Sequence, residues 1–453
     1  MVDGQRLRAA ALGAFLILGT APAGAATGDM PDLGSNVTVA KLSAGGTIIV
    51  RPAQGAPVAA IELWYRAPST GFGPKPVPSL ARLAAQVVAA SKPLIGDPLG
   101  KVVGDMGGRL SITVYSDSVA ITAIVPSTGA RAVVKSMTTA FFAPVITDDG
   151  FRQAQHDVEQ EALFTGFDPE TVVRDAVFSQ LFSAGPQHYP ALGQPRDVSA
   201  ISLADVRAFA TRAFRSQNAT LVASGTVDPS LAAAAVGGRP SDAADEGPEA
   251  PAPPTLASAP EPVSKTFVQP SGGYGWIGPA ISDERAATAM DFIADYLFRG
   301  DDGYVAKEVA RDYPDAFLVG NFITLHDPGV MFVAFSGKNA DGVKALVDAG
   351  LDRVRRPLDP ATFATALAEF SYHMRSDLQT PTQIADNFGW YTVEGAPDYA
   401  PGAGGESGAY FKAAASLTPD FVASVAQKYL GAAPAVVTLE PASDADKAKG
   451  KTP

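Results

Sequence analysis

Apolar and polar positions form two successive series of elements along the chain, and the two series have the same order. The first series is predicted to contain a strand at 58–66, helices at 79–91 and 99–106, a hairpin at 109–115 and 119–125, helices at 130–142, 148–164, 169–182 and 203–214, and a strand at 219–224. The second is predicted to contain a strand at 265–276, helices at 283–298 and 303–311, a hairpin at 316–324 and 330–336, helices at 340–355, 360–377, 381–393 and 419–430, and a strand at 435–439. A repeat of this length indicates two homologous domains.

A stretch rich in Pro, Ala, Gly and Asp separates the two series at residues 237–264. It has almost no large apolar side chain, so it cannot bury a core, and its prolines favour extended conformers. We therefore expect a first domain at 27–236, a linker at 237–264, a second domain at 265–441 and a polar tail at 442–453. Each domain is predicted to be α+β, with an antiparallel sheet covered by helices on one face.

The first residues are typical of an export signal. Arg6 and Arg8 precede an apolar run at 9–19, and Ala23-Gly24-Ala25 supplies small residues for cleavage. The run is too short to span a bilayer core of roughly 30 Å. We expect residues 1–26 to be removed and the mature protein to be periplasmic or secreted, without an integral membrane segment. The alternative is a retained N-terminal anchor.

The composition narrows the chemistry. The net charge is −12, which argues against nucleic-acid binding because phosphates require a basic surface. The chain has no cysteine, so disulfides and thiolate metal sites are impossible. It has only four histidines, which leaves few candidates for metal ligands.

Several strings resemble the insulinase-like (pitrilysin) zinc metallopeptidase family in its short, two-domain form. Residues 58–65 look like the family's first core strand, and residues 107–113 look like its Gly-Gly-x-Leu-Asn-Ala-x-Thr edge strand. His188-Tyr189-Pro190 lies where the family has a His-Pro-Tyr loop. Residues 201–209 and 218–225 resemble the closing helix and strand of the family's first domain, and they are the most specific match. The resemblance implies two homologous domains that enclose peptide.

The resemblance also implies a zinc site, and this sequence departs from it. Family members bind zinc through His-x-x-Glu-His on the first helix and a distant Glu, and the helix Glu takes a proton from the zinc-bound water. The corresponding positions here hold Arg82, Ala85 and Gln86, and the third ligand falls on Glu159 or Glu161. None of the first three is a good zinc ligand, so we expect no metal, no cofactor and no catalytic residue at this site.

The second domain departs from the family pattern as well. The family's Ser-Arg-Leu is replaced by Gly303-Tyr304-Val305, and Arg311 aligns with the next family arginine. The tyrosine that follows in the family aligns near Phe317, which lacks the hydroxyl.

The four histidines do not have metal-site spacing. His156 precedes Glu159 by one helical turn and, with Asp157 and Glu161, is either a relocated metal site or a solvated helix face. His188 is expected to hydrogen-bond its own loop, His326 to occupy a turn, and His373 to lie on a helix surface or pack.

The edge strand is a functional feature that does not depend on the zinc ligands. Family members bind peptide by adding it as a strand along this edge, and backbone bonding does not depend on side-chain identity. Arg109, Leu110, Ser111 and Ile112 are expected to line it.

We therefore predict an exported, catalytically inactive homologue that pairs with an active zinc-bearing homologue in a heterodimer and helps to enclose and bind unfolded peptides. Two alternatives stay open: an active zinc metallopeptidase with relocated ligands anchored by His156, and a stand-alone peptide-binding scaffold.

Overall fold

The computed structural model describes residues 36–236 and 253–441, except residues 43–44, 54, 56 and 301. The expected signal segment, most of the expected linker and the expected tail lie outside the described residues.

The first half is built on a six-stranded sheet with the order β1-β2-β7-β3-β5-β4. Its neighbouring strands are antiparallel except for β2 and β7, which are parallel. The elements of this half are β1 (Thr38–Lys41), β2 (Thr47–Pro52), β3 (Val58–Arg66), α1 (Leu80–Ala90), α2 (Leu99–Asp105), β4 (Arg109–Val114), β5 (Ser118–Pro126), α3 (Ala130–Phe142), α4 (Asp148–Thr165), α5 (Pro169–Leu181), β6 (Phe182–Ala184), α6 (Pro195–Ser199), α7 (Leu203–Ala213) and β7 (Ala219–Gly225).

The second half repeats the plan on a five-stranded sheet with the order β11-β12-β10-β13-β9, in which only β13 and β9 are parallel. Its elements are β8 (Thr255–Leu256), β9 (Val263–Phe267), β10 (Ser271–Ile277), α8 (Glu284–Phe298), α9 (Tyr304–Asp312), β11 (Phe317–Ile323), β12 (Val330–Ser336), α10 (Ala340–Val354), α11 (Pro360–Ser376), α12 (Pro381–Val393), α13 (Ala409–Ala415), α14 (Pro419–Leu430) and β13 (Ala435–Pro441). The predicted α+β class is therefore confirmed, with one parallel pair in each sheet.

Helices cover both faces of each sheet, where the sequence predicted one covered face. Seven consecutive residues of β3, from Ala59 to Tyr65, are buried, because a strand between two layers has no solvent side. The first half's own helices, among them α1 and α3, cover one face of the first sheet.

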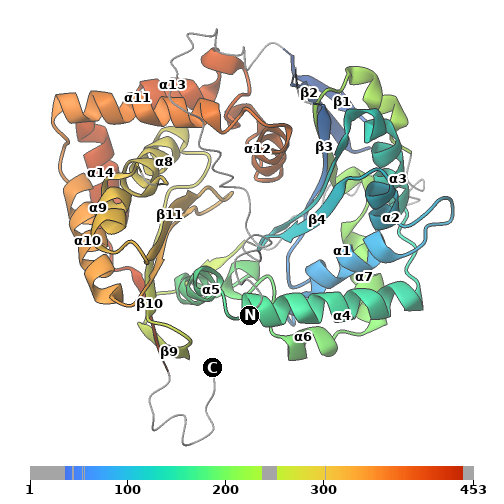
Figure 1. Cartoon of the computed structure of the whole chain (residues 1–453), viewed down its shortest axis with the longest axis horizontal. Helices are drawn as coiled ribbons and strands as arrows, with labels where there is room; N and C mark the ends of the chain where they lie inside the picture. Colours follow the sequence, from blue (N-terminus) through green and yellow to red (C-terminus); the bar gives the residue numbers. More distant parts are fainter. Residues whose placement is uncertain are drawn as a thin grey trace, which may run out of the picture.

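The second layer on each sheet comes from the opposite half. Helix α12 of the second half packs on β3 and β7, and helix α5 of the first half packs on β10, β12 and β13 (Figure 1). The two halves therefore exchange one helix each, and each sheet needs the other half to complete its core. We call the contact of α12 with β3 and β7 the α12 crossing, and that of α5 with the second sheet the α5 crossing.

Three local features differ from the prediction. Strands β1 and β2 were not predicted, although Gly45-Gly46 between two apolar runs is a hairpin signal. The single strand expected at 265–276 is two strands, which lie on opposite sides of β13. Strand β8 lies inside the expected linker and pairs with β6.

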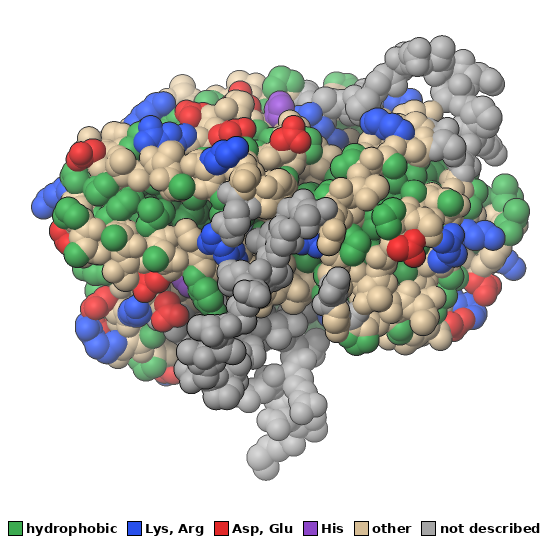
Figure 2. Space-filling view, turned by 90° about the horizontal axis from the view of Figure 1, so that it is seen from above, with side chains coloured by type: hydrophobic (Ala, Val, Ile, Leu, Met, Phe, Trp, Pro, Cys, Tyr) green, Lys and Arg blue, Asp and Glu red, His purple; other side chains and the backbone are tan. Residues whose placement is uncertain are grey.

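The surface has mixed charge. Figure 2 shows acidic and basic side chains interspersed on the face seen from above. Among the described helices, none is both long and apolar enough to cross a membrane.

Candidate functional site: the zinc-motif positions and the edge strand

Helix α1 carries the positions that correspond to the zinc motif. Eight of its eleven residues are buried, and the partly exposed ones, Arg82, Gln86 and Ala90, form a stripe with a spacing of four. Ser79 is the residue before α1, but its side chain does not cap the helix. Ser79 has a left-handed backbone (φ 70°), and its hydroxyl accepts a hydrogen bond from the Gly193 N–H at 2.7 Å.

The structure brings Arg82, Gln86 and Glu161 together. The Arg82 Nη2 atom lies 2.7 Å from Oε2 of Glu161 on α4, and its Nε donates to Oε1 of the same carboxylate at 3.3 Å. The Arg82 Nη1 atom donates to Oε1 of Gln86 at 3.0 Å. The ion pair is largely shielded, with 14% of the Arg82 side chain and 27% of the Glu161 side chain exposed. A two-point ion pair therefore joins α1 to α4.

This donor set does not fit zinc. A zinc site needs neutral or anionic ligand atoms converging on one point, and here a permanently charged guanidinium occupies that point. Ala85, at the position of the general base, is a fully buried methyl group. The residues present can neither hold the ion nor activate water as the family does.

Only one of the two candidate carboxylates faces α1. Glu159 lies elsewhere on α4 and accepts a hydrogen bond from the Ser199 hydroxyl at 2.7 Å. Residues two apart on a helix point in different directions, so Glu159 and Glu161 cannot both reach α1.

The four histidines lie apart, and each has a local role. His156 is exposed on α4. The Nδ1 atom of His188 lies 2.5 Å from the Phe182 carbonyl oxygen, that of His326 lies 2.7 Å from the Glu394 carbonyl oxygen, and that of His373 lies 3.0 Å from Oδ2 of Asp295. Within the described residues, no three His, Cys, Asp or Glu side chains form a group that could hold a metal ion.

Strand β4 is the last strand of the first sheet and lies beside α1. The Tyr115 N–H donates to the Ser118 carbonyl at 2.9 Å and closes the β4–β5 hairpin. Residues of an antiparallel pair bond to the partner strand alternately. Counting back from this bond, the N–H and C=O groups of Leu110, Ile112 and Val114 point away from β5, towards the free edge.

Two glycines shape the start of this edge. Gly107 has φ 71°, a conformation that favours glycine. A Cβ atom on Gly108 would lie 2.6 Å from the Ile124 carbonyl oxygen, so only glycine allows β4 to approach β5 here. Beyond them, the side chains of Leu110, Ile112 and Val114 pack towards the core that contains α1.

The second-half positions that align with the family's Ser-Arg-Leu, arginine and tyrosine make contacts within the second half or lie exposed. Tyr304 stacks on Tyr296 at 5.9 Å, with the Arg353 guanidinium 4.6 Å from its ring centre. Arg311 forms ion pairs with Glu308 and with Asp312. Phe317 is 39% exposed at the start of β11.

A buried carboxyl pair that was not predicted lies at the α12 crossing. Glu62 on β3 is 0% exposed, accepts a hydrogen bond from Trp64 Nε1 at 2.8 Å, and interacts with the carboxyl group of Asp386 on α12. Burial, and next the charge of Asp386, raise the pKa of Glu62 well above its usual range, and burial raises the pKa of Asp386 to about 6. The available signal was the lone carboxylate within the apolar run of β3.

Three aromatic rings from both halves surround this pair. Trp64 stacks on Tyr115 with ring centres 6.0 Å apart, and Trp390 of α12 packs edge-on against both, at 6.4 and 4.6 Å. The Trp390 indole N–H donates to the Thr324 carbonyl at 2.9 Å.

A second buried carboxyl group lies at the end of α12. The Glu394 side chain accepts the His326 backbone N–H at 2.7 Å. Burial, and next the charge of Asp117, raise the pKa of Glu394, while Arg66 opposes the shift. Burial likewise raises the pKa of Asp117, and there too Arg66 opposes it.

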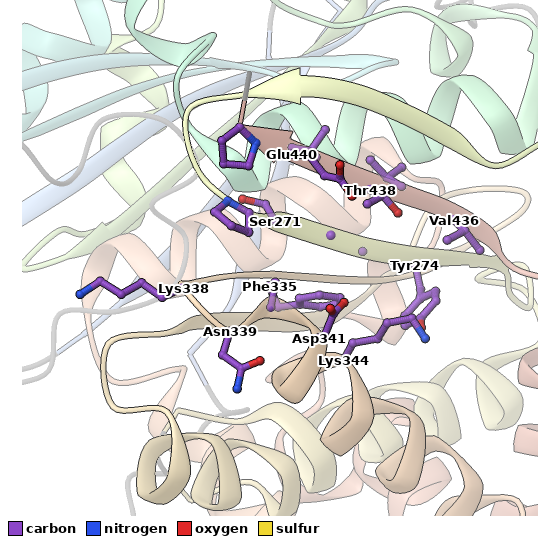
Figure 3. Close-up of a pocket in the computed structure, with 17 residues that line it drawn as sticks. Ser271, Tyr274, Phe335, Lys338, Asn339, Asp341, Lys344, Val436, Thr438 and Glu440 are labelled. Atoms are coloured by element: carbon purple, nitrogen blue, oxygen red, sulfur yellow. The ribbon is translucent and has the colours of Figure 1, made fainter. Parts of the chain in front are cut away.

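A surface pocket lies in the second half, between β10, β13 and the first turns of α10 (Figure 3). Its Lys344 forms an ion pair with Asp348 at 2.9 Å, and the Tyr274 hydroxyl donates to the same carboxylate at 2.9 Å. These polar groups already satisfy one another, and the pocket is remote in the fold from α1 and β4.

Comparisons with known proteins agree with this architecture. Residues 200–370 match the family model described as the peptidase M16 inactive domain. A protease from Helicobacter pylori has a TM-score of 0.77 at 15% identity, over 90% of this chain and 99% of that one. An M16-like peptidase from Alicyclobacillus acidocaldarius has a TM-score of 0.72 at 16% identity, over 90% and 98% of the two chains. A peptidase M16 inactive domain from Pseudomonas fluorescens has a TM-score of 0.71 at 15% identity, over 90% and 99%.

No curated protein matches the sequence. At these low identities, the structural likenesses establish the fold, and the match at residues 200–370 connects the sequence itself to the family. The predicted resemblance to the insulinase-like (M16) peptidases is confirmed by the family model at residues 200–370 and by the fold of the solved structures, and the sequence lacks the His-x-x-Glu-His motif.

Proposed function

We propose that this protein is an exported, non-catalytic subunit that pairs with an active, zinc-bearing homologue and holds extended peptide along β4. The observation that carries the proposal is the ion pair of Arg82 with Glu161, at the place where active relatives would hold zinc. A guanidinium bound at two points by a carboxylate keeps α1 and α4 together without an ion. The fold is preserved while the chemistry is absent.

The peptide-binding part of the proposal rests on the backbone of β4. Leu110, Ile112 and Val114 offer three consecutive outward sets of N–H and C=O groups, spaced as an added strand requires. Side chains enter this recognition only through the surfaces on either side of the edge, so the loss of the zinc ligands leaves it intact.

Metal content and activity test the catalytic part. The purified mature chain is expected to contain no stoichiometric zinc and to leave unfolded peptides uncleaved. One equivalent of tightly bound zinc with chelator-sensitive cleavage would overturn the proposal.

Isolation from the native host tests the pairing. A zinc-bearing homologue is expected to copurify, whereas a monomer that captures none would contradict the pairing and favour a stand-alone binding protein.

A matched pair of variants tests the edge. Ile112→Pro removes one outward N–H without touching a β4–β5 bond, and proline is tolerated on edge strands. Ile112→Ala removes side-chain bulk at the same residue but keeps the N–H. We expect Ile112→Pro to weaken binding of an extended peptide about fivefold, as for one lost hydrogen bond, and Ile112→Ala to bind nearly as the parent does. Equal losses in the two variants would contradict backbone recognition.

A further inference from the structure

The α12 crossing contains buried carboxyl groups contributed by both halves. Four charged residues in the described part of the chain are exposed by 7% or less when the whole residue is counted: Arg51, Glu62, Asp117 and Glu394. Glu62 and Asp117 come from the first half and Glu394 comes from the end of α12, so the three acidic ones all lie where the halves meet. Asp386, one turn before Trp390 on α12, adds a fourth carboxyl group.

Glu62 is fully buried on β3 where α12 packs, and its carboxyl group interacts with that of Asp386 on α12 across this crossing. Two ionised carboxylates can only accept hydrogen bonds, so a contact between them requires a proton on one of the two. The second oxygen of Glu62, Oε1, is buried without a hydrogen-bond partner among the described residues. A proton between the two side chains accounts for the contact.

We propose that Glu62 and Asp386 share one proton across the α12 crossing, which makes the cohesion of the two halves proton-dependent and strongest at mildly acidic pH. Among the described residues, no Lys, Arg or His side chain is among the groups that act on Glu62 or Asp386. Thr122 of β5 and Trp64 of β3 donate hydrogen bonds to Glu62, and Tyr115 lies against the same cluster. Arg174 of α5 acts on Tyr115 and lies 3.6 Å from Asp175.

The second carboxyl group at the crossing differs in this respect. Glu394 and Asp117 have Arg66 beside them, and His326 donates its backbone N–H to Glu394. A nearby cation favours the ionised form of a carboxyl group, so Arg66 offsets part of the shift that burial causes in this cluster, and the pair of Glu62 and Asp386 has no such charge. The proton-dependent contact is therefore assigned to Glu62 and Asp386.

The direction of the pH dependence follows from the linkage between proton binding and folding. Both carboxyl groups have pKa values that are raised in the folded protein, to about 6 for Asp386 and further for Glu62. The folded state then binds more protons than the unfolded state between the ordinary carboxyl range of about 4 and the raised folded-state values. The stability contributed by the pair is complete below that range and is lost as the pH rises through the folded-state values.

Urea unfolding of the full mature chain between about pH 5 and pH 8 tests the proposal, with tryptophan emission as the readout. Two of the three tryptophans, Trp64 and Trp390, lie at the crossing. Glu62→Gln keeps an acceptor for Trp64 and supplies an amide donor for Asp386, but it cannot lose a proton. We expect its unfolding midpoint to equal the parent's near pH 5 and to exceed it near pH 8.

Asp386→Asn is the second variant, in case Glu62→Gln does not fold, and it should flatten the pH profile in the same way. The double variant should add little to either single change, because both remove one shared proton. Asp291→Asn is the matched control. Asp291 is a buried carboxyl whose pKa burial raises to about 8, but it lies inside the second half against Tyr410.

Two results would overturn the proposal. The first is a pair of parallel pH profiles, with Glu62→Gln offset from the parent by a constant amount. The second is stabilisation of the parent by calcium or magnesium near pH 8 that Glu62→Gln abolishes, because the pair would then hold a cation and not a proton. The Asp291→Asn control should leave the difference between the parent and Glu62→Gln unchanged.

Discussion

Each crossing between the halves depends on a glycine, which lies on the strand at the α5 crossing and on the helix at the α12 crossing. At the α5 crossing the strand supplies the glycine: a Cβ atom on Gly275 of β10 would lie 2.1 Å from Cγ1 of Val177. At the α12 crossing the helix supplies it: a Cβ atom on Gly389 would lie 2.0 Å from Nε1 of Trp64. In both places a missing side chain lets a helix of one half lie close to the sheet of the other.

The two crossings differ in chemistry. Around α5 the buried side chains are almost all apolar, with Val173, Val177 and Leu181 packed on the second sheet. Around α12 the contact includes the carboxyl pair of Glu62 and Asp386 and three large aromatic rings. Apolar contacts do not titrate, whereas a buried carboxyl pair does. The α5 crossing also has a carboxyl group with a raised pKa, Asp175, but Arg174 and Lys265 favour its ionised form, so the exchange of helices has a less pH-sensitive side and a more pH-sensitive side.

Adding a methyl group at either glycine should disrupt the packing of its crossing, and we expect these substitutions to have the largest effect on stability. Gly275→Ala and Gly389→Ala should each lower the free energy of unfolding by about 3 kcal/mol, because the added methyl overlaps atoms in a packed interior. Without such overlap, alanine within a helix is favoured over glycine by up to about 1 kcal/mol. Denaturant unfolding measures both values.

Gly104→Ala is the control for that pair. Gly104 lies in α2, and a Cβ atom added there would have no described neighbour within 4 Å beyond its own stretch of helix. This variant should be as stable as the parent or slightly more stable. A neutral result for Gly275→Ala or Gly389→Ala would mean that the helix at that crossing can move aside, and the close approach would then not hold the halves together.

A second prediction sharpens the difference in pH response. Val177→Ala at the α5 crossing should cost about 2 kcal/mol at both pH 5 and pH 8, because it removes only apolar contacts. Trp64→Phe removes the indole N–H that favours the ionised form of Glu62, so the pKa of Glu62 should rise further. Its cost should therefore be about 1 kcal/mol greater at pH 8 than at pH 5.

Unfolding of both variants at the two pH values measures this contrast. Equal pH slopes would show that the α12 crossing is no more sensitive to protons than the α5 crossing. A pH-dependent cost for Val177→Ala would show that the apolar side is not the neutral reference that the comparison takes it to be.

The order of the helices and strands was predictable from the sequence, but the exchange of α5 and α12 between the halves was not. Capping and periodicity place α5 correctly, since Asp168 accepts from the Thr171 N–H and Pro169 opens the helix. An apolar helix face predicts burial but does not say which sheet will cover it. The one local hint is Ser271–Ile277, where three glycines in a short strand indicate close approach by another segment.

The zinc-motif positions were located by resemblance, and the choice between Glu159 and Glu161 could have been made from the pattern of α4. The buried residues Ala154, Val158 and Ala162 of α4 recur every four positions. Glu161 follows Ala154 by seven residues and therefore borders this buried face, whereas Glu159 does not. The ion pair with Arg82 was not predictable, because it depends on the packing of α1 against α4.

The Arg82 ion pair is a third contact, lies within the first half, and provides the smallest expected effect. Arg82→Met should lower the free energy of unfolding by about 1 kcal/mol, since it leaves the partly buried Glu161 carboxylate unpaired, and added salt should reduce the difference. Because the contact does not cross between the halves, the effects of Glu62→Gln and Val177→Ala should be the same in the Arg82→Met background.

Arg152→Met is the control. It removes an exposed ion pair with Asp149 and should have no measurable effect on stability. A loss for Arg82→Met as large as that for Gly275→Ala would show that α1 and α4 depend on the guanidinium as strongly as the two halves depend on their exchanged helices.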